Sequence, residues 1–407
     1  YPKYIASTAT IKNAKNQVKL LYGREMGIFP PIGLRANDSY FAKTISIKEK
    51  PGRTYVGFLD YRAKREDSLT PIASNLLVAP NALFQEEEGF YDSWWTQIAY
   101  HSSLRELGNN HTLYKDKIRN EIKVITKRIN QSKKDNQELS VANEVELREL
   151  KNIKTISGNQ LAKHNQTVFT DLQLSESEDN SIDVALTTEI ISVGVDVDRL
   201  SLMIINGQPS TTAEYIQASS RVGRSDVPGI VFINYYKTQS RSLSHYENFR
   251  SYHDSFYQHV EPSSITPFTF QARLRAMHAV VISAVRHSQI GLLENDAAFK
   301  FDSDDTDLKK VILKIKNRCK NSIDNKDTLN EIERHIDDIV FLWSSKVEQC
   351  KSTDMRLVYD NLGDRAFDSL LCDFSESHDS YKIPWPTLQS MRNIENIGAI
   401  EINSLNE

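Results

Sequence analysis

The sequence predicts an α/β fold in which a parallel sheet is flanked by helices, with a charged helical insertion and a helical C-terminal extension. Three short runs, Val184–Leu186, Leu202–Ile205 and Gly229–Asn234, have the apolar character and the boundaries of buried strands. Between the second and third runs, Thr211-Thr212-Ala213-Glu214 has the pattern of a capping box that begins a helix. Strands that alternate with helices are typical of a sheet covered on both faces.

Length and composition limit the kinds of protein that this chain can be. A chain of 407 residues has room for two or three domains with a full hydrophobic core. The formal net charge of -4 excludes a polycation, so any nucleic-acid surface must be a local patch. Cys319, Cys350 and Cys372 have no paired spacing, which fits a reducing cytoplasm and argues against a disulfide framework. No apolar run approaches the ~20 residues that a bilayer span needs, so we expect no membrane association.

Two arginines stand beside a glycine at the end of the expected helix, which should finish on Arg221-Val222-Gly223-Arg224. Arg221 and Arg224 flank Gly223. A guanidinium keeps its charge and offers forked donors, so it suits contact with phosphate and with charge that develops on a transferred phosphoryl group. A bare pattern of this kind more often marks a surface helix with solvated arginines. Here it is accompanied by Gln217 four residues earlier and by three residues one strand upstream: Thr188, Gly194 and Asp196.

This combination resembles motifs V and VI of superfamily 2 helicases. Residues 217–224, Gln-Ala-Ser-Ser-Arg-Val-Gly-Arg, are similar to the family pattern Q-x-x-G-R-x-G-R, with Ser220 in place of the usual glycine. Residues 187–196 are similar to motif V. Thr8-Ala9-Thr10 resembles motif III, which closes the first RecA-like domain, although an ordinary strand and turn would have the same residues.

The resemblance implies a nucleotide-facing group of residues. Arg221 and Arg224 would reach the γ-phosphate of ATP, with Arg224 as the arginine finger. Gln217 would contact the same cleft, and Gly194 and Asp196 would join the nucleotide side to the DNA side.

The resemblance also implies a DNA-facing group. Thr187 and Thr188 would hold DNA phosphates through hydrogen bonds that give position without sequence preference. Ser102 and Ser103 resemble the hydroxyls of motif IV, although a plain core strand entering a helix would have the same pattern. Coupling between the two groups would involve Thr8 and Thr10.

The main phosphate-binding motifs of such helicases do not occur in the sequence. It contains no G-x-x-x-x-G-K-[ST] loop and no D-E-x-[DH] box. We therefore expect ATP and Mg²⁺ to be held mainly by an N-terminal domain outside this chain, and the chain alone to be inactive in hydrolysis.

Three parts are expected along the chain. Residues 1–22 would be the tail of the first RecA-like domain, residues 23–240 the second RecA-like domain, and residues 241–407 a helical extension that includes a helix over Leu357–Phe374. Residues 111–155 hold eleven Lys/Arg and seven Asp/Glu, which favours a long solvated helical hairpin, or else an arm that contacts DNA or a partner.

Aromatic residues interleave with arginines after the last expected strand. Over Ser244–His259 they would either form stacking platforms for single-stranded nucleic acid or pack inward from a helix. His245 and His253 have no nearby cysteine and no H-E-x-x-H spacing, so no metal site is expected.

Several further stretches resemble the helicase subunit of DISARM antiphage systems (DrmA-like), among them Ser103–Leu107, His245-Tyr246-Glu247 and Ser390–Asn393. This resemblance implies a cytoplasmic, DNA-dependent ATPase that acts with a second defence-system subunit on DNA that is single-stranded or has single-stranded ends. Two alternatives remain: a nucleic-acid-binding or scaffold chain without turnover, and an RNA helicase of the same superfamily.

Overall fold

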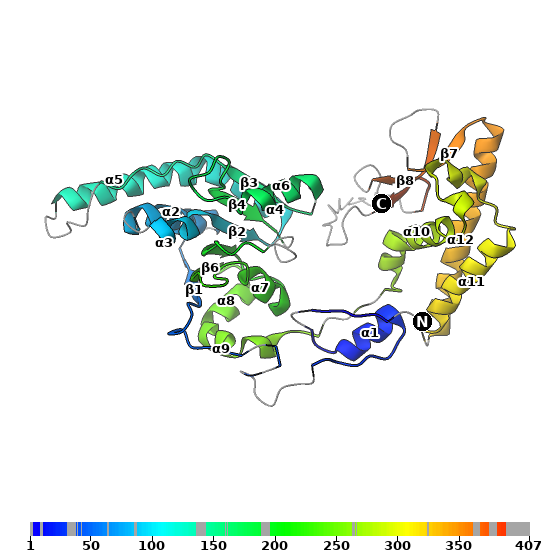
Figure 1. Cartoon of the computed structure of the whole chain (residues 1–407), viewed down its shortest axis with the longest axis horizontal. Helices are drawn as coiled ribbons and strands as arrows, with labels where there is room; N and C mark the ends of the chain where they lie inside the picture. The colour runs from blue at the N-terminus through cyan, green and yellow to red at the C-terminus, as the bar shows by residue number, and fades with distance from the viewer. Residues whose placement is uncertain are drawn as a thin grey trace, which may run out of the picture. The chain divides into compact units, whose positions relative to one another are not determined.

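The computed structural model describes residues 3–8, 11–30, 38, 40–41, 43–62, 65–84, 88–135, 144–158, 160, 162–188, 196–262, 265, 267–323, 325–360, 367–373 and 381–387. The chain divides into two compact units (Figure 1), which are described separately. The first unit consists mainly of Ile32–Glu261, and the second consists of Ile11–Pro31 and Pro262–Met391.

A six-stranded sheet forms the centre of the first unit, in the order β1-β6-β5-β2-β4-β3. Every neighbouring pair is parallel, so the predicted parallel sheet is confirmed. The three apolar runs singled out in the sequence are β4, β5 and β6. The strands are β1 (Arg53–Leu59), β2 (Gln97–His101), β3 (Ile153–Ile156), β4 (Val184–Thr187), β5 (Leu202–Asn206) and β6 (Gly229–Tyr235).

Helices cover both faces of this sheet, as Figure 1 shows. Alternate strand residues point to opposite faces, and β5 shows this directly. Met203 and Ile205 join one apolar cluster with α6, α7 and α9, whereas Ile204 joins a second cluster with α2, α4 and α5. Burial on both faces is why the strands are continuous apolar runs. The helices are α2 (Arg65–Leu83), α3 (Glu88–Trp95), α4 (Leu104–Leu113), α5 (Arg119–Asp135), α6 (Ala162–Asp171), α7 (Thr212–Ser219), α8 (Ser240–Glu247) and α9 (Phe249–Asp254).

The charged insertion differs from the solvated hairpin expected over residues 111–155. Its outward limb is helical, because α4 continues through a π-helical turn, η1 (Tyr114–Ile118), into α5. The described return segment, residues 144–150, is not helical. Ile118, Ile122 and Ile125 form a stripe at helical spacing that is buried against α2. This stripe makes one side of the arm part of the core. Most lysines and arginines of its helical limb are exposed, whereas Arg148 of the return segment is buried.

The first unit extends beyond the expected boundary at residue 240. Helices α8 and α9 and the short helix η4 (Phe256–His259) belong to it, and its main segment ends at Glu261. Tyr252 is buried, and Tyr246, Phe249 and Phe256 pack against the core beside β1, β6 and α7. These aromatics hold the segment on the sheet, so the inward-packing interpretation applies to them; Tyr257 is exposed.

The second unit is helical in its larger part but contains a small parallel sheet. Its main helices are α1 (Ala14–Tyr22), α10 (Phe270–Arg286), α11 (Thr306–Lys320) and α12 (Lys326–Ser352). The helix expected over Leu357–Phe374 is wrong, because this stretch contains β7 (Arg356–Asp360) and β8 (Phe367–Asp373), and β8 pairs in turn with β9 (Trp385–Thr387). Leu357 and Tyr359 are buried in one core with Trp343 of α12.

Helix α1 is grouped with this second unit, and Arg318 of α11 donates to the carbonyl oxygen of Leu21 at 2.6 Å. The expected role of residues 1–22 as a domain tail stays a prediction. Cys319, Cys350 and Cys372 are free thiols buried in the protein. None of the helices in the described ranges is both long and apolar enough to cross a bilayer.

Candidate nucleotide-facing and nucleic-acid-facing site

Helix α7 positions the residues that resemble motif VI. Thr211 is its N-cap, and the Thr211 hydroxyl oxygen accepts a hydrogen bond from the amide of Glu214, so the predicted helix start is confirmed. The last helical residue is Ser219. Arg221 and Arg224 therefore lie in the turn that follows the helix, not on the helix itself.

Two hydrogen bonds to backbone carbonyl groups fix this turn to the edge of the sheet. The Gly223 amide donates to the carbonyl oxygen of Leu200 at 2.8 Å. The Val222 carbonyl oxygen accepts from Nε of Arg53 at 2.6 Å, and the Val222 side chain is fully buried. Leu200 and Arg53 lie at the amino ends of β5 and β1, so the arginine turn is at the amino edge of the parallel sheet.

Gly223 is the one residue of the turn that must be glycine. Its φ is +65°, a conformation that side chains disfavour. A Cβ at this position would lie 2.8 Å from the backbone of Gly229 and 2.9 Å from Cγ of Arg53. Ser220, by contrast, has an ordinary φ of -72°, and its hydroxyl donates to the carbonyl oxygen of Gln217 at 2.9 Å. Its difference from the family pattern therefore causes no strain.

Arg224 forms an ion pair through Nη1 with the carboxylate of Asp196. The exposed fraction is 30% for the Arg224 side chain and 72% for that of Asp196. Arg221 and Gln217 are half-buried. The pair joins the stretches that resemble motifs V and VI, in a place where solvent or a ligand can reach both charges.

The residues expected to face nucleic acid lie at the opposite edge of the sheet. Tyr100 of β2 is opposite Thr187 of β4, so Ser102 and Thr188 both follow the carboxyl ends of adjacent strands. Crevices at the carboxyl ends of parallel strands are the usual ligand sites in α/β sheets. Ser102 is exposed and Thr188 is half-buried.

Two of these hydroxyl groups already have structural roles. Ser103 is the N-cap of α4 and accepts from the amide of Glu106 at 3.3 Å. Thr187 is fully buried, and its hydroxyl donates to the carbonyl oxygen of Thr188 at 3.0 Å. Thr188 thus presents more of its surface than Thr187 does.

The two described ends of the stretch that resembles motif V, Thr188 and Asp196, lie at different edges of the sheet. Thr188 lies at the carboxyl edge, and Asp196 is paired with Arg224 at the amino edge. Gly194, predicted to contact nucleotide, lies outside the described residues, as does Thr10. Thr8 is exposed and belongs to no helix or strand.

Two supporting residues had no signal in the sequence. Arg53 orients the arginine turn by donating to the Val222 carbonyl from far along the chain. Glu261 binds the amino end of α7, because its carboxylate accepts from the Thr212 amide. Both contacts are long-range, and neither residue stands in a motif.

His253 serves the core rather than a metal site. Its Nε2 lies 2.9 Å from the Tyr215 hydroxyl, and its Nδ1 lies 2.7 Å from the carbonyl oxygen of Phe249. Burial lowers the pKa of His253 below its usual value. A neutral ring with both nitrogens engaged is neither a phosphate-binding cation nor an available metal ligand.

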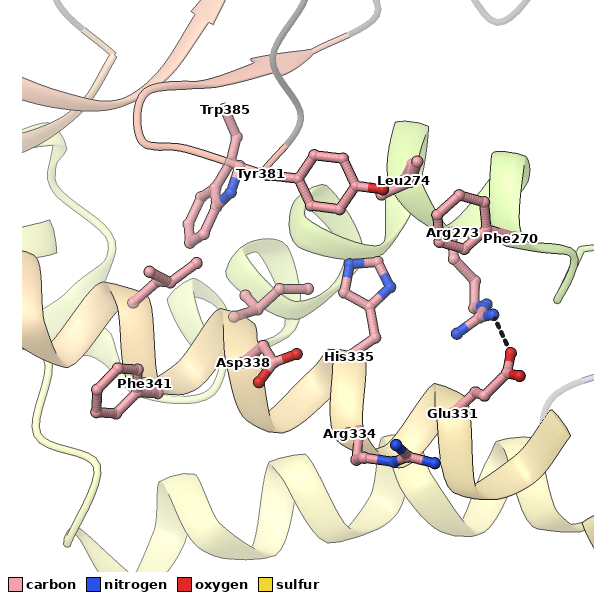
Figure 2. A pocket seen from close by; sticks show the side chains of 12 residues that line it. Phe270, Arg273, Leu274, Glu331, Arg334, His335, Asp338, Phe341, Tyr381 and Trp385 are labelled. Atoms are coloured by element: carbon pink, nitrogen blue, oxygen red, sulfur yellow. Dashed lines mark hydrogen bonds and ion pairs between the residues drawn. The ribbon is translucent and has the colours of Figure 1, made fainter. Parts of the chain in front are cut away.

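A separate hollow of about 550 Å³ opens between α10 and α12 in the second unit (Figure 2). Figure 2 shows Arg273 pointing toward Glu331, with which it forms an ion pair at 3.0 Å. Arg334 and Asp338 line the same hollow. Two arginines are thus matched by two carboxylates, a balance of charge that does not suit a polyanion such as a nucleotide or DNA.

Comparison with known proteins identifies relatives of this chain. Residues 108–226 match the family described as the helicase conserved C-terminal domain. The chain is 35% identical over 98% of its length to the DISARM protein DrmA of Bacillus paralicheniformis, and it spans about a third of that relative, 34%.

Two solved structures are similar at a lower level. The DUF1998 helicase MrfA, crystallised with DNA and AMPPNP, is 15% identical over 66% of this chain and 29% of that chain, with a TM-score of 0.41. Dbp5 of S. cerevisiae, bound to RNA and ADP BeF3, is 14% identical over 55% of this chain and 44% of that chain, with a TM-score of 0.30.

Proposed function

We propose that this chain, in which residues 108–226 match the helicase conserved C-terminal domain and which is 35% identical to the DISARM protein DrmA, is the C-terminal part of an ATP-dependent DNA helicase or translocase of superfamily 2. The observation that carries the proposal is the arginine turn. Two hydrogen bonds hold it at one edge of the sheet, and 30% of the Arg224 side chain at its end is exposed.

In this proposal Arg224 is the arginine finger. Its guanidinium leaves Asp196 and stabilises negative charge on the transferred γ-phosphoryl group, while Arg221 and Gln217 contact the same nucleotide. Gly194 and Asp196 would contribute to nucleotide binding and connect this edge to the DNA edge. Only positioning by the fold makes such a finger effective, because a mobile arginine would lose the benefit of preorganisation.

ATP and Mg²⁺ would be held mainly by the part of the protein outside this chain. Among the described residues, no group of three or more His, Cys, Asp or Glu side chains is arranged to hold a metal ion. Mg²⁺ would supply charge neutralisation at the β and γ phosphates. The described residues would contribute arginine contacts from the other side of the nucleotide.

At the carboxyl edge, Thr188 and Ser102 would contact the phosphates of a DNA strand, with Ser103 able to donate its hydroxyl hydrogen as well. Thr187 would position Thr188 from behind, since its own hydroxyl is buried. Contacts of this kind hold the backbone without reading bases. They suit a motor that moves along single-stranded DNA or enters at single-stranded ends, and Thr8 and Thr10 would link this track to the first lobe.

We further propose a role in antiphage defence, in the cytoplasm and together with a second defence-system subunit, as the resemblance to the DISARM protein DrmA implies. The same site geometry is compatible with an RNA helicase. The same fold is compatible with a scaffold protein that does not hydrolyse ATP.

ATP hydrolysis by the full-length protein distinguishes these functions. We expect stimulation by single-stranded DNA and weaker stimulation by RNA of matched sequence and length. Equal or stronger stimulation by RNA would replace the DNA assignment. No hydrolysis with either strand, in protein that binds both, would establish a scaffold.

A further inference from the structure

The carboxylate of Glu261 binds the amino end of α7 through hydrogen bonds from Thr212, and we call this contact the Glu261 clamp. Its Oε1 and Oε2 accept from the Thr212 amide at 3.0 and 2.9 Å, and Oε1 also accepts from the Thr212 hydroxyl at 3.1 Å. The Tyr252 hydroxyl donates to the same Thr212 oxygen at 3.1 Å. A carboxylate at this end of a helix is favoured by the unpaired amides and by the positive end of the helix dipole.

The position of Glu261 in the chain gives the clamp its significance. Glu261 is the last residue of the main segment of the first unit, Ile32–Glu261, and Pro262 begins the longer segment of the second unit, Pro262–Met391. The main segment of the first unit thus ends at a residue that binds the amino end of the helix leading to the arginine turn.

Helix α7 is suited to transmit a displacement between its ends. It is a single eight-residue helix, about 12 Å long at the standard rise per residue. Tyr215 and Ala218 on its inner side are fully buried. A packed element of this kind moves as a rigid body, because close-packed interiors do not deform continuously.

We propose that Glu261 is a positioning residue that couples the second unit to the arginine turn. The inference rests on the proposed function, because it assigns Glu261 an effect that acts through Arg224. A change in the path of the chain at Pro262 shifts Glu261, and the carboxylate shifts Thr212 with it. Helix α7 then carries the shift to Arg221 and Arg224, toward or away from the nucleotide.

A double-mutant cycle in the full-length protein tests this inference. Single-turnover ATP hydrolysis with single-stranded DNA is measured for the unmodified protein, Glu261→Ala, Arg224→Ala and the double variant. We expect Glu261→Ala to lower the rate roughly 2- to 30-fold, the range of coupling residues without ligand contact. In the Arg224→Ala background, the same change should have no further effect.

If the two substitutions act independently, the fold-loss in the double variant equals the product of the two single fold-losses to within about twofold. Either that result or an unchanged rate for Glu261→Ala overturns the inference. In both cases a large loss in Arg224→Ala alone would leave the proposed function intact. If Arg224→Ala is fully active, the finger assignment and the inference fall together.

Two further variants separate positioning from stability. Glu247→Ala removes an exposed acid from α8 and should leave the rate and the cycle unchanged. Glu261→Gln keeps an acceptor for the Thr212 amide, so it should fold and show a smaller loss that again disappears in the Arg224→Ala background. General destabilisation would reduce the active fraction equally in both backgrounds, and that result contradicts the inference.

Discussion

Arg224 and Asp196 form an ion pair at the amino edge of the sheet, with 30% of the arginine side chain and 72% of the aspartate side chain exposed. Exposed pairs of this kind stabilise a fold by only ~0–1 kcal/mol, because water and salt screen the charges. A phosphate group can therefore displace Asp196 at small cost. The pair keeps the guanidinium in place while 30% of the arginine side chain stays exposed.

Because this pair is exposed, we expect the loss of Asp196 to affect activity more than the free energy of unfolding. Asp196→Ala should change the free energy of unfolding by less than ~1 kcal/mol. It should nevertheless reduce DNA-stimulated ATP hydrolysis, since the nucleotide loses a contact and Arg224 loses its guide. Denaturant unfolding and steady-state kinetics of the same preparation measure the two effects. A drop in unfolding free energy of several kcal/mol would show that Asp196 is structural.

Gly223→Ala should disrupt the turn. The new Cβ would meet backbone atoms of Gly229 at 2.8 Å in a residue with φ of +65°, so we expect a loss of about 1–3 kcal/mol or more in unfolding free energy. Thermal unfolding checks the loss, and ATP hydrolysis should fall with it because the arginines move.

Gly108→Ala is the matched control. Gly108 lies inside α4, and no neighbouring side chain comes within 4 Å of the place that its Cβ would take. Alanine should therefore stabilise the helix by up to ~1 kcal/mol. Equal effects of the two substitutions would contradict the tight approach of Gly223 to Gly229.

Thr188→Ala and Ser102→Ala should weaken DNA binding several-fold, and by about the same factor for strands of different sequence, because phosphate contacts carry no sequence information. Fluorescence anisotropy at one fixed salt concentration measures the dissociation constants. Thr170→Ala provides a control, because Thr170 lies near the end of α6, away from the carboxyl edge of the sheet. A loss confined to one sequence would point to base contacts instead.

His278 should make the second unit sensitive to acid. It is 1% exposed, its Nε2 lies 3.0 Å from the carbonyl oxygen of Pro386, and its ring stacks on Trp385. Burial, together with the nearby His335, lowers the pKa of His278 to about 4. The folded pKa is below the ordinary value of 6.5, so the stabilising contribution is complete above pH 6.5 and is lost as the pH falls toward 4.

Full loss corresponds to about 3 kcal/mol. His278→Gln keeps an amide donor for Pro386 but does not titrate in this range. The difference in melting temperature between the unmodified protein and this variant should therefore shrink as the pH falls from 6.5 to 4. A constant difference across that range would show that folding does not lower the pKa of His278.

The sequence predicted the central part of the fold because local signals there agree with the tertiary structure. Val184–Leu186 is too short for a helix, and Thr211 and Glu214 have the spacing of a helix start. The local sequence pattern cannot show whether an apolar face of a helix is exposed to solvent or packs against another helix. Ile118, Ile122 and Ile125 are sparse enough to suggest a solvated arm, and only the presence of α2 shows that they are buried.

The same reason explains the errors elsewhere. Leu357 and Tyr359 would fit one face of a strand or part of a helix, and pairing with β8 decides between them. The supports of the site could not be found locally either: Arg53 and Glu261 act across the fold on Val222 and Thr212. The motif residues were predicted from sequence because their spacing is local, whereas the groups that hold them come from distant parts of the chain.

The rate of DNA-stimulated ATP hydrolysis by full-length Arg224→Ala tests the central claim most directly, with Arg224→Lys to separate charge from the forked geometry. We expect a fall on the order of 10³-fold for alanine and a large loss for lysine, with unfolding free energies close to that of the unmodified protein. Undiminished hydrolysis in Arg224→Ala would show that this arginine does not act on the transferred phosphoryl group.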